Sequence, residues 1–370
     1  MTGAISLQPL LFRPMFKEKL WGGQAFNTVL DKHAPAGKLL GESWEISACG
    51  SDLSVVAEGP MAGRTLADIC AADPRRMLGP SLAASDQFPL LYKFIDANDK
   101  LSVQVHPDDE QARANGWGKN GKTEAWYIVD AAAGARIIAG FRDGVTIDDV
   151  RAAVNASSLD SLLNYIDIAR GDVIFMPAGT VHAILAGTLI YEVQETSDTT
   201  FRLYDWGRCD SNGKPRDLHI EESLAVLGTA FHDRHKIAPL CCDDTPPGCV
   251  HLVRVACRYF ALEEFCCGAG RHLRLPEKSS FIVLTVLDGG GNLEYDGGAM
   301  KIAKGMSVFI PAALTTASVT AGPRLHFLLS SVPDLHDEII RPLRRQGIAD
   351  ADIVRLGGWE QKNDLVPLMR

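Results

Sequence analysis

The sequence predicts a mainly β protein with a few short helices and a helical C-terminal tail. Short runs alternate between apolar and polar side chains, are rich in Thr, Ile, Val, Tyr and Phe, and are separated by Gly and Pro turns. This is the pattern of half-buried strands. The segment 171–182, GDVIFMPAGTVH, also lines up with 305–316, GMSVFIPAALTT, at the same internal spacing. Because such repeats signal duplicated units, we expect two β domains.

Size and charge limit the class of protein. A chain of 370 residues is long enough for two or three domains. Its 46% hydrophobic and 22% charged residues are typical of a globular protein. We expect no membrane span, because no run of about eighteen apolar residues occurs. The net charge of −9 makes nucleic acid a poor candidate partner.

The cysteines and the N-terminal segment predict the cellular compartment of the protein. Residues 1–20 lack the basic-then-apolar layout of a signal peptide. The nine cysteines are therefore expected to be free thiols in a reducing cytosol, which predicts a cytoplasmic protein. The adjacent pairs Cys241-Cys242 and Cys266-Cys267 lack the C-x-x-C spacing of a structural zinc site.

The first half of the chain is expected to contain one β domain, over residues 1–215. Its N-cap threonine and helical spacing predict a short helix over Thr65–Leu78, and Thr146–Tyr165 is predicted to form two more. The predicted strands are Pro89–Ala97, Leu101–His106, Gly121–Val129, Ala135–Phe141, Val173–Met176, Thr188–Val193 and Thr199–Tyr204.

A second β domain is expected over residues 216–332, with a tail over 333–370. Residues 216–230 are predicted to form a connecting helix, and DDTPPG at 243–248 is a linker-like turn cluster. Two short helices are predicted in the tail. They favour a packed or dimer-clasping arm over a DNA-binding element, and a monomer or homodimer is expected.

Two strands place polar side chains in succession on one face. Lys100, Ser102, Gln104 and His106 alternate with apolar residues in the first, and Lys122, Glu124 and Trp126 do so in the second. Together with His182, the strands offer His106 and Glu124 as ligands for zinc or another divalent transition metal, and Gln104 could add an amide oxygen.

Further polar groups follow His182 along the chain. Glu192 and Arg202 alternate with apolar residues, so both could face one barrel cavity with His182. Less specific explanations stay open at this point. Glu192 and Arg202 could form a structural salt bridge, Lys122 and Glu124 could form an exposed ion pair, and Lys100 and Arg208 could be solvated surface charges.

Four segments together resemble the class I mannose-6-phosphate isomerases. They are QVHPDD (104–109), GKTEAWYI (121–128), GDVIFMPAGTVHAI (171–184) and ETSDTTFRLYDWGR (195–208), and weaker similarity occurs at LWGG (20–23) and GESWEIS (41–47). The resemblance implies two cupin jelly-roll barrels (a bicupin), with the metal in the first barrel. Thr316 stands where the repeat would require a second His182, so the second barrel is expected to hold no catalytic metal.

The resemblance also implies roles for individual residues. Small departures occur at Phe201, where a Tyr is common, and at Gly207, where an acid is common. The implied metal ligands are Gln104, His106, Glu124 and His182; the catalytic arginine is Arg202; the proton-transfer groups are Lys122 and Glu192; and the substrate-binding groups are Lys100, Ser102 and Arg208.

The implied reaction interconverts mannose 6-phosphate and fructose 6-phosphate through a cis-enediolate, with one Zn²⁺ per chain. Arg202 is always charged, so it suits stabilisation of the enediolate better than removal of a proton. Either Glu192 or Lys122 could be the base. Two other classes remain open: an Fe(II) oxygenase that uses the same two histidines and carboxylate, and a non-catalytic sugar-sensing cupin.

Overall fold

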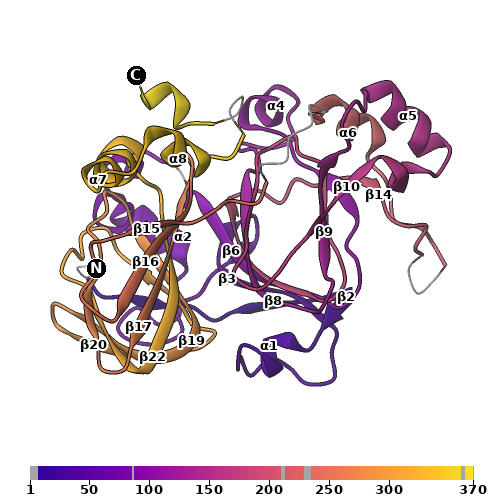
Figure 1. The fold of residues 1–370 in the computed structure, drawn as a ribbon. Coiled ribbons are helices and arrows are strands. Elements are labelled where there is room, and N and C mark those ends of the chain that lie inside the picture. Colours follow the sequence, from indigo (N-terminus) through magenta and orange to yellow (C-terminus); the bar gives the residue numbers. More distant parts are fainter. Residues whose placement is uncertain (1–6, 86, 210–212, 229–234, 360–362, 370) are drawn as a thin grey trace.

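The computed structural model describes residues 7–85, 87–209, 213–228, 235–359 and 363–369. Figure 1 shows two β-rich bodies side by side, one built mainly from the first half of the chain and the other mainly from the second half. The prediction of a mainly β protein with few short helices is confirmed. No helix in the described ranges is long and apolar enough to cross a membrane.

The first body is a barrel of two antiparallel sheets. The five-stranded sheet has the order β10-β9-β12-β7-β14, and the six-stranded sheet has the order β11-β8-β13-β6-β3-β2. Their strands are β2 (Met15–Gly23), β3 (Leu40–Ile46), β6 (Leu90–Ala97), β7 (Val103–Val105), β8 (Glu124–Ala131), β9 (Arg136–Phe141), β10 (Leu163–Asp167), β11 (Val173–Met176), β12 (His182–Ile184), β13 (Thr188–Glu195) and β14 (Phe201–Tyr204). A small hairpin, β4 (Ala48–Cys49) with β5 (Asp52–Leu53), lies beside them.

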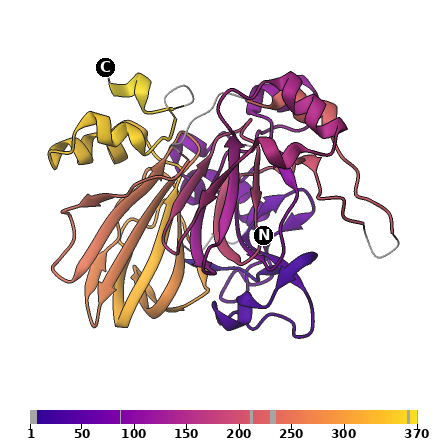
Figure 2. The same cartoon turned by 45° about the vertical axis from the view of Figure 1, so that its right-hand side comes forward.

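The second body is a nine-stranded antiparallel sheet with the order β1-β21-β19-β22-β17-β16-β15, in which β18 pairs with β22 and β20 with β19. Figure 2 shows its long strands lying side by side. Its strands are β1 (Leu10–Leu11), β15 (Leu240–Cys242), β16 (Cys249–Ala256), β17 (Ala261–Gly268), β18 (His272–Arg274), β19 (Ile282–Tyr295), β20 (Gly298–Ala303), β21 (Ser307–Ile310) and β22 (Ser318–Ser331).

The internal repeat appears as two matching strands. β11 and β21 are each four fully buried residues followed by a proline. Thr316 lies exposed in the turn before β22. The long strand β19 changes register near Gly291, where a side chain would meet the Thr320 carbonyl oxygen at 2.2 Å, so only glycine fits there.

Outside the tail, the helices are short and connect strands along the chain. Thr65 caps its helix through the hydroxyl oxygen, as expected, and Thr146 does the same. The helix expected over Thr65–Leu78 is divided in two at Asp73, which caps the second part before Pro74. The helices outside the tail are α1 (Ala25–Thr28), α2 (Leu66–Ala72), α3 (Pro74–Leu78), α4 (Asp109–Ala114), α5 (Ile147–Asn155), α6 (Ile220–Val226) and two 3₁₀ helices, Pro80–Leu82 and Leu159–Leu162.

One predicted helix is wrong. Residues 146–165 form a single α-helix, α5, and then a 3₁₀ turn that leads into β10. Ser157 adopts a positive φ of 53°, which ends the helical path, and β10 pairs with β9. The backbone hydrogen bonds of this segment are therefore made across a sheet, which local helical spacing could not reveal.

The tail packs against the second body, above its strands in Figure 1. A π-helical turn, Leu335–Ile340, leads into α7 (Arg341–Arg345); α8 (Asp350–Arg355) and a 3₁₀ helix, Val366–Met369, follow. Apolar side chains of the tail, including Ile340 and Leu356, join the core cluster that runs between the two bodies. The expected boundaries at 215 and 332 remain predictions, and β1 belongs to the second sheet although it precedes the first barrel.

Candidate active site

Sheet register brings the predicted site residues to the inside of the first barrel. Gln104 on β7 is the cross-strand partner of both His182 on β12 and Arg202 on β14. Directly opposed residues of an antiparallel pair point to the same side of the sheet. Glu124 begins β8 in the opposite sheet, and its partner across β13 is Gln194. The two sheets therefore present these groups to one interior.

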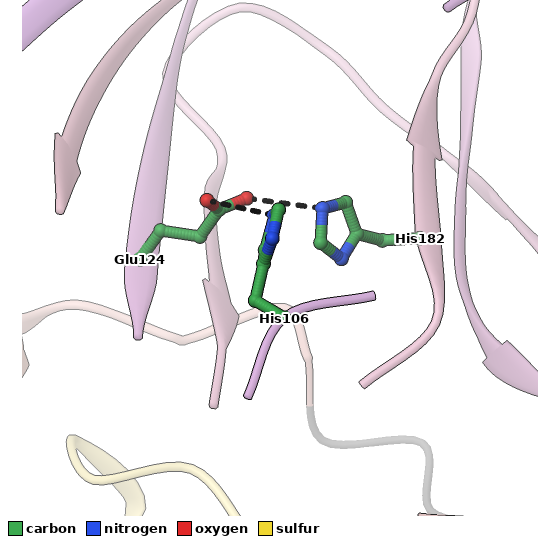
Figure 3. Close-up of side chains that lie close together, drawn as sticks. All are labelled: His106, Glu124 and His182. Atoms are coloured by element: carbon green, nitrogen blue, oxygen red, sulfur yellow. Dashed lines mark ion pairs between the residues drawn. The ribbon is translucent and has the colours of Figure 1, made fainter. Parts of the chain in front are cut away.

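Figure 3 shows His106, Glu124 and His182 pointing toward one another. Nε2 of His182 lies 3.2 Å from Oε1 of Glu124, and Nε2 of His106 lies 3.6 Å from Oε2 of the same carboxylate. The three residues are 1–2% exposed. Oε1 of Glu124 has no hydrogen-bond partner in the described part of the chain. A buried carboxylate oxygen without a partner is costly unless a cation accompanies it.

Backbone carbonyls fix the orientation of both imidazoles. Nδ1 of His106 lies 2.9 Å from the carbonyl oxygen of Thr199, and Nδ1 of His182 lies 2.9 Å from that of Thr180. Each Nδ1 therefore carries the proton, and each Nε2 presents a lone pair to Glu124. Burial, reinforced for His106 by the charge of Lys122, lowers the pKa of both histidines. Both rings are neutral, as metal coordination requires.

Lys122 is part of this cluster. Its Nζ lies 2.6 Å from Oε2 of Glu124 and 3.0 Å from Nε2 of His106, and the side chain is buried. The explanation of Lys122 and Glu124 as an exposed ion pair is therefore wrong. Burial alone would raise the pKa of Glu124, but the charge of Lys122 lowers it below its usual value. The carboxylate is ionised at neutral pH.

The donor set fits a divalent transition metal. One ligand atom from each of His106, Glu124 and His182 lies within 4.8 Å of the others. The side-chain amide of Gln104 is 3.3 Å from Nε2 of His182, and a rotation that exchanges its nitrogen and oxygen would place Oε1 at the same position. Two neutral nitrogens, a carboxylate and an amide oxygen form a ligand set that zinc accepts.

The carboxylate of Glu192 contacts Lys93 and Trp126, not Arg202. Nζ of Lys93 lies 2.8 Å from Oε2 of Glu192, and Nε1 of Trp126 donates a 2.9 Å hydrogen bond to Oε1. The interpretation of Glu192 and Arg202 as a salt bridge is wrong. The sequence did not predict Lys93 as part of the site, because its strand was interpreted as a buried apolar strand. A lysine inside such a strand was the available signal, since all eight residues of β6 are buried and a buried cation requires a partner.

Arg202 is half-buried on the inner side of β14, while Phe201 and Leu203 pack on the other side. Its Nη1 donates a 2.7 Å hydrogen bond to the carbonyl oxygen of Asp217. Its Nε is buried and has no hydrogen-bond partner among the described residues. Burial and the neighbouring charge of Arg216 lower the pKa of the Arg202 guanidinium.

A cluster of positive groups lies next to Arg202. Arg208 and Arg216 both bind the carboxylate of Asp205, at 2.6 and 2.7 Å, and Arg208 also donates to the carbonyl oxygen of Lys100. Nζ of Lys100 lies 4.1 Å above the ring of Trp206. Arg216 was not predicted, because it comes from an irregular segment without periodicity. Arg208 is partly buried in this cluster and is not a solvated surface charge.

One detail of the predicted strand 101–106 is wrong. Leu101 packs in the interior cluster with Trp126, whereas Val103 and Val105 pack on the outer side of their sheet. The regular strand begins only at Val103, so the alternation does not extend back to Leu101. Ser102 is buried just before this strand.

Two facing antiparallel sheets that enclose two imidazoles and a carboxylate define a cupin-type protein. The family described as "Phosphomannose isomerase type I, catalytic domain" matches residues 10–132, and "Mannose-6-phosphate isomerase, cupin domain" matches residues 252–327. The mannose-6-phosphate isomerase ManA of Bacillus subtilis (strain 168) is 33% identical over 311 residues, which cover 84% of this chain and 95% of the relative. The probable mannose-6-phosphate isomerase GmuF of the same organism is 35% identical over 304 residues, which cover 82% of this chain and 93% of the relative. This chain belongs to the type I mannose-6-phosphate isomerases and is an isomerase.

Solved structures agree with this assignment. The crystal structure of mannose 6-phosphate isomerase from Bacillus subtilis superposes with a TM-score of 0.79 at 32% identity, and it covers 87% of this chain and 99% of that chain. A putative mannosephosphate isomerase from Archaeoglobus fulgidus has a TM-score of 0.71 at 21% identity over 89% of this chain and 100% of that chain, which supports the fold alone. The tail lies beyond the second family match, which ends at residue 327.

Proposed function

We propose that this isomerase interconverts mannose 6-phosphate and fructose 6-phosphate through a cis-enediolate, with one catalytic zinc-class ion per chain. The observation that carries the proposal is the convergence of His106, Glu124 and His182 in the barrel interior, with Oε1 of Glu124 buried and unpartnered. Gln104 would complete the ligand set. A bound divalent ion would polarise the sugar carbonyl and adjacent hydroxyl without changing oxidation state.

Two groups can move the proton between C1 and C2, and their settings differ. Lys122 contacts the ligand residues directly, so its Nζ lies next to any sugar oxygen held at the site. Glu192 has one oxygen engaged by Lys93 and the other by Trp126. We therefore assign proton transfer at carbon to Lys122 and proton transfer between the two oxygens to Glu192.

Hydrogen exchange with solvent separates these two roles. A group that removes the carbon-bound proton is needed both for isomerisation and for exchange of that hydrogen with deuterated water. A group that serves only the oxygens is needed for isomerisation alone. Lys122→Met should lose both reactions, whereas Glu192→Gln should lose isomerisation and retain exchange. The reverse pattern would exchange the two assignments.

Arg202 and the nearby positive cluster fit an anionic substrate. The unpartnered Nε of Arg202 is a buried donor on the side of β14 that faces Gln104, where charge develops on the enediolate oxygen. Lys100 and Arg208, together with the buried Ser102, are assigned to the substrate phosphate. Bidentate guanidinium groups suit phosphate oxygens well.

The direct test is a coupled isomerase assay on protein of defined metal content. Metal-stripped protein should be inactive with mannose 6-phosphate, and added Zn²⁺ should restore turnover. Oxygen consumption in place of isomerisation would indicate an Fe(II) oxygenase. Stoichiometric sugar-phosphate binding without turnover by the metal-loaded protein would indicate a sensor.

A further inference from the structure

A second group of metal-ligand side chains lies far from the active site in sequence, at the edge of the nine-stranded sheet. Cys242 ends β15, and its cross-strand partner on β16 is His251. Asp244 follows two residues after Cys242 in the turn that joins the strands. One ligand atom from each of the three side chains lies within 4.8 Å of the others.

The His251 ring is held in an orientation that suits a ligand. Its Nδ1 faces Oδ1 of Asp244 at 2.8 Å, and its Nε2 faces Oε2 of Glu263 at 2.8 Å. Glu263 is in turn paired with Lys278 at 2.5 Å. The ring also stacks on Phe265, with centroids 4.2 Å apart. A carboxylate on the far ring nitrogen is the usual support of a metal-bound histidine, because it fixes the tautomer and strengthens the ligand.

Burial and rigidity favour a built site over a chance cluster. Cys242 and His251 are each 5% exposed, whereas Asp244 is exposed and leaves one side open to solvent. The turn between the strands contains Pro246 and Pro247, and the backbone N–H of Cys249 donates to the carbonyl oxygen of Pro246 at 3.0 Å. The ligands are therefore positioned by a short, restrained hairpin.

We propose that Cys242, Asp244 and His251 form a second, non-catalytic site for a zinc-class divalent ion, with water as the fourth ligand. A thiolate, an imidazole and a carboxylate are all zinc ligands. Nδ1 of His251 and Oδ1 of Asp244 now share a 2.8 Å contact, so they would move apart to admit an ion at bond lengths of about 2.0–2.2 Å. Binding would release two protons, one from the Cys242 thiol and one from Nδ1 of the His251 imidazolium. The two positive charges of the dication would take the place of these two protons. The net charge of the pocket is unchanged, so the pair of Glu263 and Lys278 stays balanced.

The position of the site indicates a structural role. β15 is an edge strand, which pairs with one neighbour, β16, in the described part of the chain. The backbone N–H of Asp243, next to the proposed ligands, donates a 2.8 Å hydrogen bond to the side chain of Gln346 at the end of α7. An ion bound at this hairpin would stabilise the position of the edge strand and, through the contact with Gln346, of the C-terminal tail. It would stabilise the second body without contact to the catalytic residues.

Cobalt substitution distinguishes this site from the active site. The active-site ligands are nitrogen and oxygen only, so a sulfur-to-cobalt charge-transfer band in the near ultraviolet can arise only where a cysteine binds the ion. Metal-stripped full-length protein titrated with Co²⁺ should develop this band, and the Zn²⁺-loaded protein should contain about two zinc ions per chain. Cys242→Ser should lose the band and one ion, have a lower Tm, and keep its kcat.

Two matched variants serve as controls. Cys241→Ser changes the exposed neighbouring thiol, and Cys266→Ser changes the thiol of another cluster that contains His326; both should retain the band and both ions. If Cys242→Ser fails to fold, the exposed ligand variant Asp244→Asn should weaken Co²⁺ binding at the sulfur site by at least about tenfold. The proposal is overturned if the wild-type protein shows no band, or if the band persists in Cys242→Ser.

Discussion

Replacement of Arg202 by alanine separates catalysis from structure. Among the described residues, the Arg202 side chain makes one hydrogen bond, to the carbonyl oxygen of Asp217, and it is half-buried. Glu192 keeps its own partner in this variant, because it binds Lys93. We expect Arg202→Ala to lower the free energy of unfolding by only about 1 kcal/mol, the size of an ordinary hydrogen bond. In a protein of 370 residues that corresponds to a fall in Tm of about 1 °C.

The expected effect on catalysis is much larger. A donor aimed at an oxygen that becomes negative in the transition state contributes about 2.7–4 kcal/mol, so kcat should fall about 10²–10³-fold with little change in KM. Arg202→Lys should recover little of this activity, because a single ammonium cannot reproduce the planar guanidinium. The assay measures kcat, KM, Tm and bound metal on one preparation of each variant.

A neighbouring arginine provides the matched control. Arg216 carries the same charge but is bound to Asp205. Arg216→Ala should therefore raise KM for the sugar phosphate and leave kcat nearly unchanged. If Arg202→Ala is less stable but turns over at the wild-type rate, the assignment of Arg202 to the transition state is wrong.

Three further outcomes are expected. His182→Ala should lose most of the catalytic metal and the activity, and full metal occupancy in that variant would remove the site from consideration. Lys93→Met should lower the free energy of unfolding by about 3–5 kcal/mol, because Glu192 would remain buried without its cation. Urea unfolding measures this loss. The double variant Lys93→Met/Glu192→Gln should recover part of it. In metal-stripped protein, His106 and His182 bind protons more readily when unfolded, since their folded pKa values are lowered, so stability should fall as the pH drops below about 6.5. A Tm that stays level between about pH 7 and 5 would contradict this reasoning.

Side-chain alternation was sufficient to predict the centre of the site. A period of two residues placed Gln104 and His106 on one face and Lys122 with Glu124 on another, and the structure brings these groups together with His182. This worked because each residue lies in, or next to, a regular strand. The prediction needed only the assumption that the polar face points inward.

Other parts of the site depend on which strands become neighbours. Lys93 pairs with Glu192 because β6 lies beside β13, and no local pattern in either strand states that order. Arg216 reaches Asp205 from a segment without regular structure. The strand β10 was mistaken for a helix because its partner β9 lies some twenty residues earlier in the chain. Long-range pairing, not local propensity, decided these cases.

The charge of the site also follows from particular contacts. The chain carries a net charge of −9, yet its substrate is expected to be an anion. Arg202 donates to a backbone carbonyl, and Arg208 donates to the carbonyl oxygen of Lys100 as well as to Asp205. Asp205 is shared by Arg208 and Arg216, and Asp99 lies 3.9 Å from Arg208. These two carboxylates are outnumbered by the cations Lys100, Arg202, Arg208 and Arg216, so the cluster keeps an excess of positive charge. Because that excess is partly buried and weakly screened, capture of the sugar phosphate should slow as ionic strength rises, while kcat should not change.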